Sequence, residues 1–360
     1  MVIDRDFPLF ESTIWVLDDI SPLRQWDLSN GEKIVLYTPS PTIRLRANQN
    51  KDTPFTPETP LGQNPPTGAV VDYFLAEKSA TGVELEVHDA AGALIQKFSS
   101  TAPESDIETS PYFTADWCKE PQVLSADAGS HRFVWNLRMP RPRAIEYQYS
   151  NTASRTDGAA LTPEGPLVLP GEYRLTLRVA DKSVERALII LPDPRVTASA
   201  SDMEASERLA EDLTRDLHRI WQAYAEVGAI RIQIIDNLPM LKVKHATGLL
   251  RQLEEFDRAL LELVSTEGEE SGSFVANGEI LANLETDIEG SDRRPTEAQR
   301  QVRAAANART DETIYRWQRL QAERLVAINR QLVEVHLPPL VVPDAAHLRS
   351  VAAPEGVDVP

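Results

Sequence analysis

The spacing of apolar residues changes once along this chain, and that change most constrains its fold. Before Leu191, apolar and polar residues alternate in short runs such as Tyr173-Arg174-Leu175-Thr176-Leu177, a period of two that is typical of half-buried strands. After Leu191-Pro192-Asp193-Pro194-Arg195, apolar residues recur every three or four positions, as on amphipathic helices. The sequence therefore predicts an α+β multidomain protein in which a β domain precedes a helical domain.

The first domain, residues 69–194, has the pattern of a β-sandwich. Turn-forming residues separate short strands, as at Asp89-Ala90-Ala91-Gly92 and Pro170-Gly171. The predicted strands span residues 69–75, 83–88, 93–98, 131–137, 173–179 and 184–191. This rhythm is typical of immunoglobulin-like or fibronectin type III-like sandwiches. Two insertions, about 99–128 and 139–169, are expected to form long loops, where binding function often resides.

The second domain, residues 199–340, is predicted to be an antiparallel helical bundle. Ser201 and Glu204 match a capping box at the start of a long helix that runs towards Pro239. The further helices are expected over residues 243–265, 279–288 and 295–332. Since the connections between them are short, neighbouring helices should run antiparallel.

Three segments lie outside these two domains. Residues 1–50 contain apolar runs, at 14–17 and 34–37, that predict strands. Residues 51–68 contain five prolines, and proline lacks the amide hydrogen that a sheet ladder needs, so this segment is predicted to be an extended linker. Residues 341–360, which are rich in Pro, Ala and Val, are expected to form a disordered tail.

The charge balance and the residue counts exclude several classes of partner and site. With 55 acidic and 37 basic residues, the net charge of -18 argues against binding to nucleic acid or to an anionic membrane surface, both of which need a basic surface. Cys118 is the only cysteine, so neither an intramolecular disulfide nor a thiolate metal cluster can form. The six histidines are scattered, and no glycine-rich phosphate loop is present. The sequence therefore predicts no metal and no cofactor.

The first long insertion contains the candidate functional residues. Asp106, Glu108 and Asp116 could supply the pair of carboxyl groups that a glycosidase requires. Tyr112 and Trp117 could stack against a sugar ring, or they could pin the loop onto the sandwich, as large aromatic side chains usually do. These residues lead to two alternative functions, a glycoside hydrolase fragment and a carbohydrate-binding module.

Four sets of residues stand in an order that is known from one protein family. They are Trp15-Val16-Leu17-Asp18-Asp19, Asn64-Pro65-Pro66, His131-Arg132-Phe133-Val134-Trp135-Asn136-Leu137-Arg138, and Pro170-Gly171-Glu172-Tyr173 with Asp193-Pro194-Arg195. In this order and spacing they resemble the C-terminal region of the BNR-repeat, sortilin-like β-propeller proteins, which are often labelled glycosyl hydrolases. The resemblance implies that residues 1–50 hold the remnant of a last propeller blade and its exit strands. It also implies that the propeller itself, with any ligand-binding residues, precedes this chain.

The leading hypothesis from the sequence is a non-catalytic structural or interaction module. We expect residues 1–25 to engage a separately encoded β-propeller chain or a second copy of this chain, because the apolar run at residues 14–17 would otherwise be an unpaired strand. A split partner, a decayed gene and a misplaced start all fit this pattern. The first residues lack the features of a secretory signal, and no stretch is long enough to span a bilayer. A soluble protein is expected, cytoplasmic as it stands, although intact family members can be exported.

Overall fold

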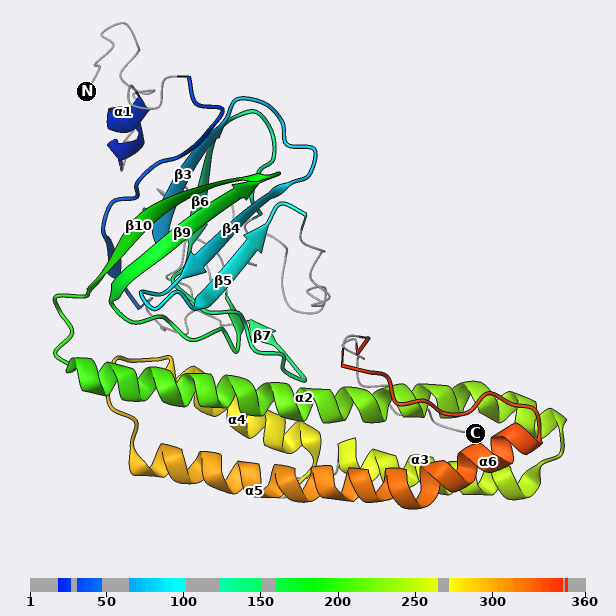
Figure 1. Ribbon diagram of the computed structural model, residues 1–360. Helices are drawn as coiled ribbons and strands as arrows, with labels where there is room; N and C mark the ends of the chain where they lie inside the picture. Colours follow the sequence, from blue (N-terminus) through cyan, green and yellow to red (C-terminus); the bar gives the residue numbers. More distant parts are fainter. Residues whose placement is uncertain are drawn as a thin grey trace, which may run out of the picture.

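The computed structural model describes residues 19–26, 31–46, 65–101, 123–149, 160–264, 272–345 and 347–348. It has an α+β architecture in which an N-terminal β region with two main sheets is followed by a long helical region (Figure 1). The predicted order of the two kinds of structure is confirmed. No helix in the described ranges is both long enough and apolar enough to cross a membrane.

The smaller of the two main sheets has three antiparallel strands in the order β1–β3–β6. They are β1 (Ile34–Leu36), β3 (Ala69–Leu75) and β6 (Gly129–Trp135). Every second residue of β3 is buried, in agreement with the period of two in its sequence. The inward side chains of this sheet include Tyr73, whose hydroxyl donates a hydrogen bond to the Ser125 carbonyl at 2.8 Å, and the fully buried Trp135.

The larger sheet has five strands in the order β2–β10–β9–β4–β5. They are β2 (Thr42–Arg44), β4 (Val83–His88), β5 (Leu94–Ser99), β9 (Gly171–Val179) and β10 (Lys182–Pro192). Neighbouring strands are antiparallel except β2, which is parallel to β10. Buried side chains of this sheet, such as Leu85 and Leu177, join those of the smaller sheet in one hydrophobic core. A separate pair, β7 (Gln148–Tyr149) and β8 (Leu161–Thr162), lies beside the helical region (Figure 1).

Strands β1 and β2 come from the segment that the family resemblance interprets as propeller exit strands. They pair with the two main sheets, so the β region includes residues well before residue 69. A short helix, α1 (Ser21–Gln25), lies on this part of the β region. Its Gln25 side chain donates to the Thr38 carbonyl at 3.0 Å and accepts from the Thr38 amide at 2.8 Å. The next residue, Trp26, packs edge-on against Phe74.

The helical region begins with α2 (Ala200–Val243), a helix of 44 residues that spans about 66 Å at 1.5 Å per residue. Its N-cap is Ser199, whose side chain accepts a hydrogen bond from the Asp202 amide, while the Asp202 carboxylate accepts one from the Ser199 amide. This capping box lies two residues before the predicted one. The helix also continues through Pro239, since the burial of Leu241 in the helical core offsets the backbone hydrogen bond that proline cannot make.

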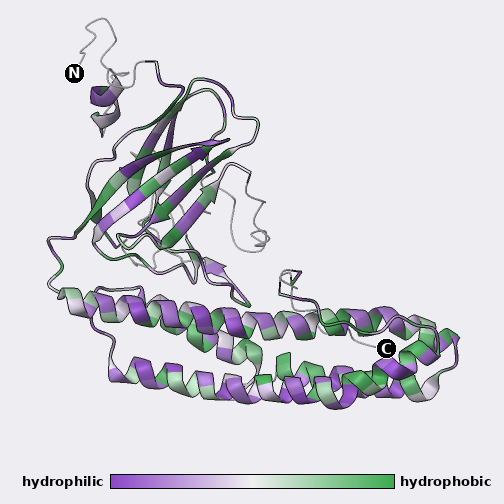
Figure 2. Ribbon diagram, in the orientation of Figure 1, coloured by the Kyte–Doolittle hydropathy of each residue, from purple (hydrophilic) through white to green (hydrophobic). Residues whose placement is uncertain are grey.

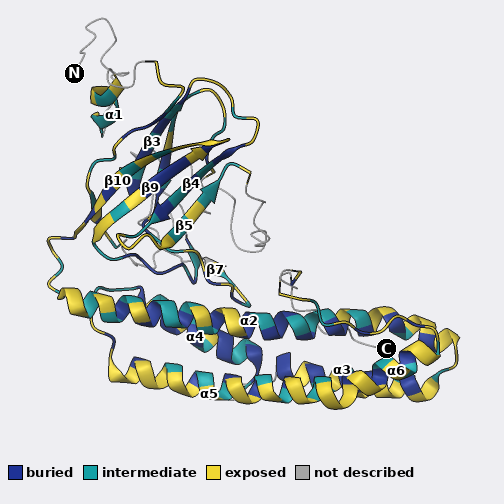
Figure 3. Ribbon diagram, in the orientation of Figure 1, coloured by how far each residue is buried: buried dark blue, intermediate teal, exposed yellow. Residues whose placement is uncertain are grey.

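The remaining helices run back and forth along α2. They are α3 (Thr247–Val264), α4 (Phe274–Ile288), α5 (Glu297–Leu320), the π-helical turn η4 (Gln321–Leu325) and α6 (Val326–Glu334). The first two, α3 and α4, follow one another along α2 in the opposite direction, and α5, η4 and α6 return beside them (Figure 1). Hydrophobic and hydrophilic residues are interspersed along these helices (Figure 2), and the outer side of α5 is largely exposed (Figure 3). The helices form a second hydrophobic core that includes Phe256, Trp317 and Leu332.

The chain after α6 folds back along α2. The side-chain amide of Asn329 exchanges hydrogen bonds with the backbone of Leu340, and that of Gln233 does so with the backbone of Val341, all at 2.7–2.9 Å. Further along, Leu348 is buried against Trp221. Residues 341–345 and 347–348, at the start of the segment expected to be disordered, therefore lie in the described part of the chain.

Candidate functional site at the junction of the two regions

The residues singled out for catalysis or sugar binding all fall between residues 102 and 122. Asp106, Glu108, Tyr112, Asp116 and Trp117 therefore lie outside the described residues. Among the residues that are described, no group of three or more His, Cys, Asp or Glu side chains could hold a metal ion. The candidate site that the structure does describe is elsewhere, where the β region meets the turn between α4 and α5.

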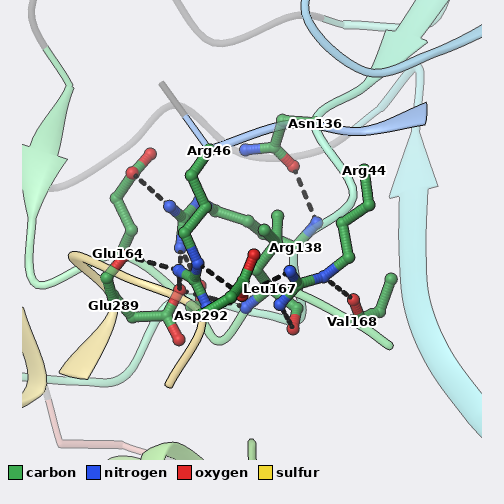
Figure 4. A network of polar contacts seen from close by, with 10 residues as sticks. Arg44, Arg46, Asn136, Arg138, Glu164, Leu167, Val168, Glu289 and Asp292 are labelled. Atoms are coloured by element: carbon green, nitrogen blue, oxygen red, sulfur yellow. Dashed lines mark hydrogen bonds and ion pairs between the residues drawn. The ribbon is translucent and has the colours of Figure 1, made fainter. Parts of the chain in front are cut away.

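A cluster of buried charges joins the two regions at this point (Figure 4). We call it the junction cluster. It consists of Arg44, Arg46, Arg138, Glu164, Glu285, Glu289 and Asp292. The arginines come from β2, from the residues just after it and from the segment after β6, whereas three of the carboxylates come from α4 and the turn that follows it. The cluster therefore connects the β region to the helical region directly.

Asp292 is held by two arginines from the β region. Its Oδ1 atom accepts from Arg44 Nη1 at 2.6 Å and from Arg46 Nε at 2.7 Å. The side chains of Arg44 and Asp292 are only 3% and 5% exposed. Burial alone would raise the pKa of Asp292, but the charge of Arg46 and the hydrogen bond from Arg44 outweigh it, so the pKa lies below the ordinary value. Asp292 is therefore a charged partner in the folded protein.

Arg138 lies between two glutamates. Its guanidinium is 3.1 Å from the carboxylate of Glu164 and 2.8 Å from that of Glu289, and it donates to the Gly165 carbonyl at 2.7 Å. The Arg138 carbonyl in turn accepts a hydrogen bond from the buried Trp135 indole at 2.9 Å. Strand β6 therefore positions Arg138 at the junction through its last residue.

Glu285 is the member of the junction cluster whose charge is not matched. Its side chain is fully buried, and neither carboxyl oxygen has a hydrogen-bond partner among the described residues. Burial, and then the negative charge of Glu289, raise the pKa of Glu285 well above its usual range. When Glu285 is protonated, three guanidinium groups face three ionised carboxylates, and the cluster is balanced.

The raised pKa predicts how stability changes with pH. The folded protein binds the Glu285 proton more tightly than the unfolded chain does, because the pKa is higher in the folded state. The resulting stabilisation is complete below the pKa of the unfolded chain, about 4.3. It is lost as the pH rises towards the pKa of the folded protein. Burial likewise raises the pKa of Glu207, on α2, to about 7. We expect Glu285→Gln to become progressively more stable than the wild type as pH rises from 4.5 to 7. Urea unfolding of both proteins at several pH values measures the difference in their free energies of unfolding. The contribution of Glu207 cancels in this difference, because both proteins contain it. A difference that does not change with pH would contradict the prediction.

A cleft lies beside the junction cluster, between the segment after β6 and one face of α2. We call it the arginine cleft. Its volume is about 380 Å³, and it is lined by Met139, Pro140, Arg141, Pro142, Arg143, Pro166, Glu211, Thr214, Arg215 and His218. These residues fall partly in the insertion 139–169, which the sequence predicts to be a loop that could bind a ligand. The prediction did not include the residues on α2.

Gly165 allows the two loops beside this cleft to approach closely. A Cβ atom at this position would overlap with the Met139 carbonyl oxygen and would lie 2.6 Å from that of Pro140. Both are backbone atoms, so they cannot move aside as a flexible side chain would. The same contact lets the Met139 amide donate to the Pro166 carbonyl at 2.9 Å. The shape of the arginine cleft therefore depends on a glycine at residue 165.

The sequence offered little signal for the junction cluster. Arg44 and Asp292 are 248 positions apart, and Arg138 and Glu289 are 151 apart. Charged residues are frequent throughout this chain, so pairs at such separations leave no local pattern.

In comparisons with protein-family models, with curated proteins and with solved structures, no match was found.

Proposed function

We propose that this chain is a non-catalytic structural and interaction module. In this proposal an immunoglobulin-like or fibronectin type III-like β-sandwich is followed by an antiparallel helical bundle, and the junction cluster holds the two as one body. The ion pairs at the junction support this proposal, because buried and hydrogen-bonded charge pairs restrict the relative orientation of the groups that form them. The helical region, about 66 Å long, would then keep a constant angle to the β region and present a long surface.

The observation that carries the interaction role is the apolar surface of α1. Leu23 of α1 is 64% exposed, and the flanking Ile20 and Trp26 are 44% and 49% exposed. They are exposed although Trp26 packs against Phe74 and Gln25 fastens α1 to the β region. Large apolar side chains that gather on one short element are typical of a binding surface. They directly follow the apolar run at residues 14–17, which is expected to seek a partner.

The partner in this proposal is a separately encoded β-propeller chain or, in its absence, a second copy of this chain. The resemblance of the chain to the C-terminal region of sortilin-like, BNR-repeat proteins supports the first of these. In such an arrangement α1 and the residues before it would lie against the propeller, and the helical rod would project away from it. The rod would then be free to contact a further protein.

Light scattering coupled to size-exclusion chromatography tests this proposal. We expect the purified chain to self-associate as its concentration rises, because α1 lacks its proper partner. Removal of residues 1–18, which leaves the Gln25 contacts in place, should reduce this association, and Leu23→Glu should do so as well. Val243→Glu is the matched control, since Val243 is 72% exposed at the far end of α2.

Two outcomes would count against the proposal. The first is a chain that is monomeric at all concentrations and unchanged by the deletion or by Leu23→Glu. The second is a loss of self-association in Val243→Glu, because it would place the interaction surface at the far end of the rod instead of at α1.

A further inference from the structure

The arginine cleft is built from rigid parts. On one side, Pro140 and Pro142 restrict the backbone, since the proline ring fixes φ. The Tyr147 hydroxyl donates to the Pro142 carbonyl at 2.5 Å and accepts from the Ala144 amide at 3.2 Å, so it ties this segment down. On the other side, Glu211, Thr214, Arg215 and His218 project from one face of α2. The cleft is therefore largely formed before any ligand arrives.

Two of its arginines are held in place by aromatic rings. The Arg143 guanidinium carbon lies 4.5 Å from the centre of the Trp221 ring, and that of Arg141 lies 5.8 Å from the centre of the Tyr147 ring. Within the described residues, both guanidinium groups contact these rings, and neither is joined to a carboxylate by a hydrogen bond or ion pair. Both side chains are exposed, so their donors are available to a ligand.

The charge of the cleft is opposite to that of the whole chain. Three arginines line it together with one glutamate, whereas the chain carries a net charge of -18. Arg215 is paired with Glu211 and Asp212, so the excess positive charge is that of Arg141 and Arg143. The fourth basic side chain, His218, stacks on Trp221, and burial followed by the charge of Arg143 lowers its pKa. Like charges brought together in this way repel one another, and a bound anion would relieve that repulsion.

The walls of the cleft indicate what else the ligand carries. They are mostly apolar, formed by Met139 and three prolines. Thr214 also lines the cleft, although its hydroxyl is buried and has no hydrogen-bond partner among the described residues. Pockets with apolar walls and a few convergent polar groups are typical of sites for small organic ligands. An inorganic anion would leave these walls without contacts.

We propose that the arginine cleft binds a small organic carboxylate. The carboxylate accepts hydrogen bonds from Arg141 and Arg143, because the guanidinium fork matches its geometry. A ring-sized apolar body lies against the prolines. This site is independent of the interaction surface on α1 and goes beyond the proposed structural role.

Calorimetric titration of the full chain with cinnamate, at neutral pH and low salt, tests the proposal. We expect saturable one-to-one binding of cinnamate. Its neutral amide, cinnamamide, and acetate, which has the carboxylate without the ring, should each bind at least about tenfold more weakly, because one charge-assisted hydrogen bond or one buried ring is worth about 1.4 kcal/mol or more. Arg143→Gln and Arg141→Gln should each weaken cinnamate binding about tenfold for the same reason.

The matched control is Arg258→Gln, which removes the same charge from an exposed position on α3. It should leave cinnamate binding unchanged. The pKa of His218, followed by NMR, gives a second measurement that reports on this cleft alone. A carboxylate bound beside Arg143 should raise this pKa, since it offsets the positive charge that lowers it. The circular dichroism of each variant should match that of the wild type.

Three results would overturn the proposal. The first is an absence of saturable cinnamate binding, and the second is equal binding of cinnamate and cinnamamide. The third is cinnamate binding that does not shift the His218 pKa and is as strong in Arg141→Gln and Arg143→Gln as in the wild type. The last of these would place the carboxylate at another basic surface. None of these results bears on the role of α1, which the light-scattering experiment tests separately.

Discussion

Replacing Arg138 with methionine is expected to lower the free energy of unfolding by about 3–5 kcal/mol. Arg138 is the shared cation of Glu164 and Glu289, and its side chain is only 16% exposed. Methionine preserves much of the side-chain length but removes the charge, so two carboxylates are left facing each other in a poorly solvated site. The loss exceeds that of an exposed ion pair, which typically contributes no more than about 1 kcal/mol.

Urea unfolding of Arg138→Met and of a matched control, Arg258→Met, measures this effect. The control removes an exposed arginine and should change the free energy of unfolding by no more than about 0.5 kcal/mol. If the two variants lose the same amount, the junction cluster does not stabilise the fold in the way described.

The same variant should loosen the connection between the two regions. Spin labels at exposed positions 182, the first residue of β10, and 244, just after α2, allow the distance between the regions to be measured after Cys118 is replaced by serine. We expect a narrow distance distribution in the otherwise native chain and a broader one in Arg138→Met. A broad distribution in the native chain would contradict a single rigid body.

Phe256→Ala is expected to destabilise the helical region by about 3–5 kcal/mol, since Phe256 is fully buried in the core of that region. The more informative result concerns the β region. If the junction cluster couples the two regions, the unfolding of both should shift to lower urea concentration together. In chains that contain fluorinated tryptophan, the NMR signal of Trp135 reports on the β region and that of Trp317 on the helical region.

Two controls complete this experiment. Tyr315→Ala removes an aromatic side chain that is 56% exposed on α5, and it should change stability by no more than about 0.5 kcal/mol. In an Arg138→Met background, Phe256→Ala should shift the Trp317 transition but leave that of Trp135 nearly in place. If Phe256→Ala alone leaves the Trp135 transition at the same urea concentration, the two regions unfold independently.

The sequence by itself determined the kinds of structure and their order. Alternation in residues 173–179 and helical spacing after residue 195 depend only on which face of each element is buried, and that information is local. Pro295 also indicated the start of the last long helix, and α5 begins two residues later, after a capping box of Thr296 and Gln299. The start of α2 was predicted two residues late, because Ser199 and Ser201 are equally plausible caps when judged from sequence alone.

Tertiary structure alone decided the features that bear on function. Arg44 contacts Asp292 only because β2 is parallel to β10 and the turn after α4 reaches the same place. The arginine cleft likewise exists because Gly165 lets two loops meet and α2 passes beside them. In a chain with 55 acidic and 37 basic residues, a charged side chain has many potential partners in sequence, and only the three-dimensional fold selects among them.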